Sequence, residues 1–180
     1  MALGLNVALI GLSGAGKTTV APLAAARLGF PWVDLDADIE RVSGKDLASL
    51  FADGGAEFRV LEAEALERAL AASRPGVVIA CGGGIVSVRA TRERLRARAF
   101  VVWLRVSPER AAARLGAEGV ESRPLLQESA VPTGRLEAML RERGPLYESA
   151  ADAVVDTEGR SPEEVADQIA DLCRPDPTWT

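Results

Sequence analysis

The eight residues GLSGAGKT at positions 11–18 limit the possible folds of this chain more than any other feature of its sequence. They match the pattern G-x-x-x-x-G-K-[ST] at every fixed position, and they lie between the apolar run LNVALI and the helix-compatible stretch VAPLAAARL. A glycine-rich loop that joins a strand to a helix presents backbone N–H groups to phosphates at the helix N-terminus. The loop therefore predicts a nucleotide-binding α/β domain.

The same motif predicts roles for two side chains. Lys17 is expected to hold the β- and γ-phosphates of the nucleotide, and Thr18 to ligate Mg²⁺. Lys17 and Lys45 are the only lysines, so the N-K-x-D type of element that recognises guanine is absent from the sequence. This favours an ATP-dependent kinase over a GTPase switch. The loop residues predicted to bind ATP are Gly14, Ala15, Gly16, Lys17, Thr18 and Thr19.

Short apolar runs alternate with helix-compatible stretches along the rest of the chain. Five of these runs are predicted to be buried parallel strands: 5–10, 31–35, 77–80, 100–106 and 151–156. The alternation predicts a doubly wound α/β sheet in one domain over residues 1–180, and together with the phosphate loop this is the P-loop kinase fold. In this α/β fold an open five-stranded parallel sheet carries helices on both faces.

Two helices and one long loop are predicted between and after these strands. The stretch 56–73 places apolar residues on one helical face, and 161–173 opens with a serine cap followed by proline and acidic residues. The segment 116–134 contains glycine, proline and charge without clear periodicity, so we expect an irregular loop there. Pro22 is expected to kink the helix that follows the phosphate loop, because it cannot donate to the Thr18 carbonyl.

Composition narrows the class of partner. A net charge of −5 and a pI near 4.9 argue against nucleic acid or an anionic membrane, and no apolar run reaches the ~20 residues of a membrane span. The chain has no histidine and only two cysteines, which excludes a zinc site or a histidine-based triad. Reduced thiols in a cytoplasmic, monomeric protein are the expectation.

The stretch 31-PWVDLDADIE-40 carries carboxylates directly after an apolar strand. On a strand Asp34 and Asp36 would project to one face, about 7 Å apart. Ligands of open parallel sheets bind beyond the carboxyl ends of the strands, so Asp34 is expected to hold Mg²⁺ through water and Asp36 to accept a proton from an attacking hydroxyl. Asp38 and Glu40 suit the first turn of a following helix. The alternative is that Asp34, Asp36 and Asp38 are solvated acids on a loop without a functional role.

Six motifs together resemble the shikimate kinase family. They are GLSGAGKTT, the D-L-D at 34–36, 58-FRVLE-62, 82-GGG-84, 122-SRPLL-126 and 143-RGPLY-147, in the order and spacing of that family from about Leu5 to Leu172. The resemblance implies ATP-dependent phosphorylation of the 3-hydroxyl of shikimate with Mg²⁺ as the metal. It also implies a substrate-binding helical region at about 36–62 and a mobile lid at about 112–125.

The resemblance further implies roles for individual residues. Asp36 would contact the substrate hydroxyls and act as the base, and Asp34 would support Mg²⁺. The remaining residues are Arg59 and Arg143 for the substrate carboxylate, Gly83 and Gly84 for backbone contact with substrate, Arg123 on the lid over the phosphates, and Arg160 near the adenine. A planar guanidinium suits a carboxylate, and glycine allows close approach of backbone.

Two other functions fit the phosphate loop. One is another small-metabolite kinase of the gluconate type, and the other is a nucleotide-binding module without turnover. The presence of Lys17, Asp36 and Arg123 disfavours the module. One departure from the family pattern is Gly55, where members usually carry glutamate, and it is expected to loosen the start of the helix at 56.

Overall fold

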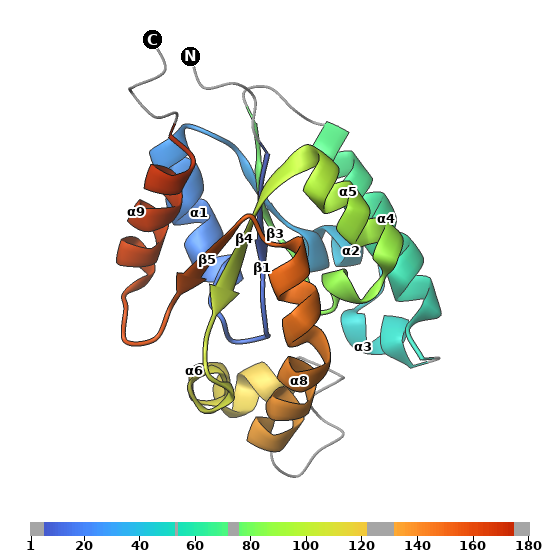
Figure 1. Ribbon diagram of the computed structural model, residues 1–180. Coiled ribbons are helices and arrows are strands. Elements are labelled where there is room, and N and C mark those ends of the chain that lie inside the picture. The colour runs from blue at the N-terminus through green and yellow to red at the C-terminus, as the bar shows by residue number, and fades with distance from the viewer. Residues whose placement is uncertain (1–5, 53, 72–75, 122–131, 175–180) are drawn as a thin grey trace.

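A five-stranded parallel sheet forms the centre of the molecule (Figure 1), in a computed structural model that describes residues 6–52, 54–71, 76–121 and 132–174. The strand order is β2-β3-β1-β4-β5. The strands are β1 (Asn6–Ile10), β2 (Trp32–Asp34), β3 (Val78–Ala80), β4 (Ala99–Arg105) and β5 (Ala153–Asp156). The predicted fold, an open five-stranded parallel sheet, is confirmed.

Helices cover both faces of this sheet. Figure 1 shows α1 and α9 on one side and α2, α4 and α5 on the other, while α6 lies beyond the carboxyl end of β4. The helices in the described ranges are α1 (Lys17–Leu28), α2 (Leu35–Ser43), α3 (Leu47–Phe51), α4 (Ala56–Ala71), η1 (Ile85–Ser87), α5 (Arg89–Arg98), α6 (Pro108–Glu121), α8 (Pro132–Ala150) and α9 (Pro162–Leu172). None of them combines the length and apolar content needed to cross a bilayer.

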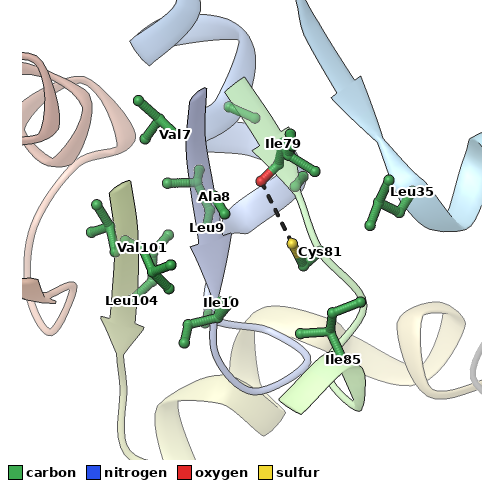
Figure 2. Packing of buried hydrophobic residues seen from close by; sticks show 14 of the residues in the cluster. Val7, Ala8, Leu9, Ile10, Leu35, Ile79, Cys81, Ile85, Val101 and Leu104 are labelled. Carbon is green, nitrogen blue, oxygen red and sulfur yellow. Dashed lines mark hydrogen bonds between the residues drawn. The ribbon is translucent and has the colours of Figure 1, made fainter. Parts of the chain in front are cut away.

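The core lies on the two faces of the central strands. Every residue of β1 and β3 is buried, because helices on both sides remove each strand from water (Figure 2). Leu104 of β4 belongs to the same core, and Leu35 and Ile85 extend it beyond the ends of their strands (Figure 2). This double burial explains why the strands are continuous apolar runs in the sequence rather than alternating ones.

Strand register brings three chain segments to one edge of the sheet. Asp34 pairs with Ala80, and Ala80 pairs with Leu9, so the three residues lie side by side. The phosphate loop begins two residues after Leu9, and the triple-glycine turn begins two residues after Ala80. The loop, the turn and Asp34 therefore meet at the carboxyl edge, where ligands of open parallel sheets bind.

The strand predicted over 31–35 is shorter than expected. It ends at Asp34, whose carboxylate accepts hydrogen bonds from the backbone N–H groups of Asp36 and Ala37 and so caps α2. The prediction that Asp34 and Asp36 share a strand face is wrong, because Asp36 lies in the first helical turn. Trp32 is 45% exposed because β2 is an edge strand.

The segment predicted to be an irregular loop over 116–134 is partly helical. Helix α6 continues to Glu121 across a break at Gly116 (φ 60°, ψ −171°), and α8 already begins at Pro132. The break interrupts the helical period, which explains the lack of a pattern in the sequence. Residues 122–131, with Arg123 and the whole motif SRPLL, lie outside the described residues.

The two other expected irregularities differ in outcome. Helix α1 includes Pro22 and continues to Leu28, and the expected kink at Pro22 stays a prediction. The turn before α4 is closely packed: Gly55 has φ 75°, and a Cβ there would lie 2.8 Å from the Phe51 ring. That ring contacts Phe58 at a centroid distance of 4.5 Å. The start of α4 is therefore held tightly by glycine rather than loosened by it.

Candidate active site

The phosphate loop curls around the ammonium group of Lys17. Its Nζ donates hydrogen bonds to the carbonyls of Gly11 and Leu12 at 2.8 and 2.7 Å, and the residue is only 8% exposed. Gly14 and Gly16 have φ of 81° and 94°, which glycine adopts without strain. The backbone conformation predicted from the motif, with Lys17 at its centre, is therefore present at the N-terminus of α1.

Thr18 and Asp34 form the pair predicted to bind a metal. The Thr18 hydroxyl donates to Asp34 Oδ2 at 2.6 Å, while Asp34 Oδ1 accepts the two N–H groups that cap α2. Within the described ranges no group of three or more His, Cys, Asp or Glu residues could hold a metal. Two oxygen side chains fit Mg²⁺, which usually keeps several waters and is shared with phosphate oxygens.

The triple-glycine turn after β3 packs against two carboxylates. A Cβ at Gly82 would lie 2.8 Å from Asp36 Oδ1 and 3.1 Å from Glu62 Oε1. Only a residue without a side chain leaves room for both groups. The turn therefore brings Asp36 of α2 beside Glu62 of α4, two residues that are far apart in the sequence.

The same turn packs against both predicted substrate arginines. A Cβ at Gly84 would lie 2.8 Å from Arg59 Nη1, so the guanidinium occupies the space that a side chain would need. Arg143 of α8 donates through Nη1 to the Gly83 carbonyl at 3.3 Å. Asp36, Arg59 and Arg143 thus surround one turn. This turn lies next to the phosphate loop, because a Cβ at Gly83 would lie 3.4 Å from the backbone nitrogen of Ser13.

Glu62, the last residue of the motif FRVLE, is a buried acid for which the sequence predicted no role. It is 2% exposed and pairs with Arg59 through Oε2 at 2.6 Å, while its buried Oε1 has no hydrogen-bond partner among the described residues. Burial raises the pKa of Glu62 to about 7, against the lowering effect of Arg59 and with a further raising effect of Asp36. The Glu62 carboxyl group therefore gains or loses its proton near neutral pH, beside the predicted substrate site.

The raised pKa of Glu62 predicts a pH-dependent part of the stability of the fold. This contribution is complete below the unfolded value of 4.5 and is lost as pH rises through about 7. Relative to Glu62→Gln, the wild type should lose about 2–3 kcal/mol of unfolding free energy over that range. The measurement is urea unfolding of both proteins from acid to neutral pH.

The exposed Glu64 on the same helix offers a control variant, Glu64→Gln, for the removal of one carboxylate from α4. A difference between wild type and Glu62→Gln that stays constant over this pH range would contradict the assignment, since it would mean that Glu62 keeps one protonation state throughout.

A cavity of about 370 Å³ extends from the carboxylates past the phosphate loop. Asp34, Asp36, Cys81 and Gly83 line one part of it, the loop lines the middle, and Arg114, Thr157 and Arg160 line the other part. The Cys81 thiol is buried against β3 and faces the Ile79 carbonyl (Figure 2), and this burial raises its pKa. The cavity thus joins the predicted metal and substrate groups to the predicted adenine end.

Two arginines shape the far part of this cavity. Arg160 donates through Nη2 to the Glu164 carbonyl at 3.1 Å and also contacts Gln168, so α9 holds it at the wall. Arg114 donates to the Oγ1 and carbonyl oxygen of Thr157 at 2.8 and 2.5 Å. Arg160, predicted to lie near the adenine, lines the same cavity as the phosphate loop, and its contact with adenine stays a prediction. Arg123 lies outside the described residues, so its predicted position is not tested.

Comparison with known proteins points to a single family. A model of the family described as shikimate kinase matches residues 13–174. The shikimate kinase of Symbiobacterium thermophilum is 43% identical over 166 residues, covering 92% of this chain and 94% of that protein. The shikimate kinase of Thermobifida fusca is 47% identical over 163 residues, covering 90% and 91%.

Solved structures agree with the sequence relatives. Shikimate kinase from Acinetobacter baumannii in complex with shikimate is similar at a TM-score of 0.86 and 34% identity, covering 93% of this chain and 92% of that chain. A gluconokinase from Sinorhizobium meliloti 1021 is similar at a TM-score of 0.58 and 20% identity, covering 96% and 93%. The second similarity shows a shared fold alone.

Proposed function

The chain belongs to the shikimate kinase family, and on that basis we propose that it transfers the γ-phosphoryl group of ATP to the 3-hydroxyl of shikimate. The products are shikimate 3-phosphate and ADP. The relatives named shikimate kinase span nearly the whole chain, so the proposal concerns the whole domain rather than one part of it. The gluconate-type alternative rests only on a shared fold.

The observation that carries the proposal is the convergence of two arginines and an aspartate on the glycine turn. Arg59 and Arg143 come from α4 and α8, yet both contact the turn against which Asp36 packs. Two guanidinium groups suit a carboxylate, and an aspartate suits hydroxyl groups. A small hydroxylated acid is the substrate class that this set of side chains binds best. The backbone of Gly83 and Gly84 would contact its ring.

The nucleotide would lie along the cavity that the phosphate loop lines. The loop backbone and Lys17 would hold the phosphates, and Arg160 would lie near the adenine. Thr18 and Asp34 would hold Mg²⁺, Asp34 through a water molecule. When bound, the metal would neutralise charge that develops on the phosphate oxygens.

Asp36 would accept the proton of the reacting hydroxyl. The bond from the substrate oxygen to the γ-phosphorus forms as the bond to the β-phosphate oxygen breaks, and ADP leaves with that oxygen. The Asp36 carboxylate takes up the proton that the new ester cannot keep. Its position against the glycine turn, next to both arginines, supports this role.

Three further parts of the proposal stay predictions. Arg123 and the rest of a lid over about 112–125 would close over the phosphates and exclude water. The single-domain organisation over residues 1–180, with substrate contacts from about 36–62, is expected from the sequence. A monomeric, cytoplasmic enzyme is also expected.

An ADP-release assay with a small panel of acids tests the proposed function. With ATP and Mg²⁺, we expect turnover with shikimate and at least about ten-fold lower kcat/KM with quinate and with gluconate, because one misplaced polar group leaves site groups unpaired. The highest rate with gluconate would favour the gluconate-type alternative. ADP release with none of the acids, in a protein that binds ATP, would favour a module without turnover.

A further inference from the structure

We propose that Tyr147 is a positioning residue of the substrate site: its hydroxyl fixes the Gly83 carbonyl and thereby the glycine turn that seats Asp36, Arg59 and Arg143. The expected effect of Tyr147 on shikimate binding rests on the proposed function. Its expected effect on the glycine turn does not. Tyr147 contributes no atom to the reaction and acts through the Gly83 carbonyl and the Arg143 side chain that it contacts.

The hydroxyl of Tyr147 is a buried group that donates to one carbonyl and accepts a hydrogen bond from the Arg143 side chain. The side chain is fully buried, and its hydroxyl donates to the Gly83 carbonyl at 2.5 Å. Burial raises the pKa of this phenol to about 12, so it carries its proton throughout the neutral range. The ring alone would pack equally well as phenylalanine, stacked on Trp103 at 5.7 Å. The hydroxyl therefore needs an explanation beyond packing.

Arg143 depends on the same carbonyl. It lies one helical turn before Tyr147 on α8, so both side chains approach Gly83 from one face of that helix. Its bond to the carbonyl is longer, at 3.3 Å, and its buried Nε has no hydrogen-bond partner among the described residues. Two donors on α8 thus converge on the one carbonyl oxygen of Gly83.

Fixing one carbonyl orients the whole turn. In a trans peptide the Gly83 carbonyl and the Gly84 N–H point in opposite directions, so holding the oxygen toward α8 sets the direction of the N–H. Three successive glycines have wide conformational freedom and would otherwise rotate easily. Because the turn also packs against Asp36 and Arg59, its rotation would disturb all three substrate groups.

Removing only the hydroxyl tests this role. In Tyr147→Phe we expect the Kd for shikimate to rise about 3- to 10-fold, the loss of one hydrogen bond, while the Kd for ATP changes by less than about two-fold. Isothermal calorimetry measures both constants. Ile169→Val is the matched control, since it removes one buried methyl group from α9 and leaves both Kd values unchanged.

A double-variant cycle separates positioning from general packing. Because Tyr147 and Arg143 act through one carbonyl, Tyr147→Phe should weaken shikimate binding by less than about two-fold in an Arg143→Lys background. Equal loss in both backgrounds would overturn the proposal. So would an unchanged shikimate Kd in the single variant, or an equal loss of ATP affinity.

Hydrogen exchange in the ligand-free protein tests the turn itself. The peptide that contains Gly83 and Gly84 should exchange faster in Tyr147→Phe than in the wild type, while Ile169→Val leaves it unchanged. Unchanged exchange of the turn would overturn the proposal even in a protein that binds shikimate. If the wild type fails to bind shikimate, the proposed function falls, while faster exchange in Tyr147→Phe would still support the hydroxyl as the group that holds the turn.

Discussion

Lys17→Ala should lower kcat by about 10³-fold or more, while shikimate still binds. The ammonium would stabilise charge on the transferring phosphoryl group, and fixed charges in such sites are worth roughly 10²–10³-fold for a single donor and more for a cation. The measurement is ADP release at saturating substrates, together with shikimate affinity by calorimetry. A kcat near that of the wild type would contradict the assignment of the phosphate loop.

The structure adds a cost in stability to this prediction. Lys17 Nζ donates to the carbonyls of Gly11 and Leu12, and alanine would leave both without that donor. A lost hydrogen bond to a charged group typically costs about 1.5–3 kcal/mol, so some loss of thermal stability is expected. Shikimate affinity within about three-fold of wild type would show that the glycine turn and its arginines persist in the variant.

The second lysine of the chain supplies the control. Lys45 is exposed and pairs with Glu57 at 2.7 Å on the surface. Such surface pairs contribute about 0–1 kcal/mol, so Lys45→Ala should keep kcat and lose little stability. A comparable fall of kcat in Lys45→Ala would mean that charge in general, and not the ammonium in the loop, controls turnover.

The fold was predictable because its signals are local. Each of the five strands is a short apolar run, and each lies within two residues of its predicted boundaries at either end, as 151–156 against Ala153–Asp156 illustrates. A parallel sheet that is buried on both faces produces such runs directly. The phosphate loop is also local, since eight consecutive residues define both its backbone conformation and its lysine.

The boundary between β2 and α2 at Asp34 shows that a local apolar pattern does not separate the end of a strand from the start of a helix. Strand β2 passes into α2 without a connecting loop, so the last residue of the strand is also the cap of the helix. Apolar Leu35 extends the strand pattern, yet it faces the core from the first helical turn. An aspartate before a helix-compatible stretch is a capping signal, and weighing it would have placed Asp36 on the helix.

Glu62 and Tyr147 were missed for different reasons. Glu62 lies on the apolar face of α4, four residues from both Phe58 and Leu66, and an acid at such a position is a signal that the sequence contains. Tyr147 has no such signal. Its partner Gly83 is 64 residues away, and only the packing of α8 on the sheet brings the hydroxyl and the carbonyl together.

Asp36→Asn should lower kcat by about 10²-fold or more, since it removes the proton acceptor and preserves the shape of the side chain. The affinity for ATP should change little, because the predicted metal pair is Thr18 with Asp34 and the phosphates lie on the loop. The measurements are kcat at saturating substrates and the Kd for ATP. A loss of ATP affinity as large as the loss of kcat would instead assign Asp36 to the metal.

Asp38→Asn is the control for this variant, because Asp38 lies in the same first turn of α2. Its carboxylate pairs with Arg41 and Arg68, and these hydrogen bonds, set against partial burial, lower its pKa. The lowered pKa of Asp38 stabilises the fold at any pH above the pKa of an unfolded aspartate. This contribution is lost as pH falls through the pKa that Asp38 has in the folded protein. Asp38→Asn should therefore lose stability at neutral pH and keep kcat.

The glycine turn links Asp36 to Glu62 and provides a second readout of the same variant. The charge of Asp36 raises the pKa of Glu62, so replacing it with a neutral amide should shift that pKa downward from about 7. In Asp36→Asn, the stability that wild type loses between acid and neutral pH should then be lost at a lower pH. Urea unfolding across this range measures the shift without any substrate. A midpoint that does not move would mean that the charge of Asp36 does not raise the pKa of Glu62, and the coupling of the two carboxylates across the turn would be refuted.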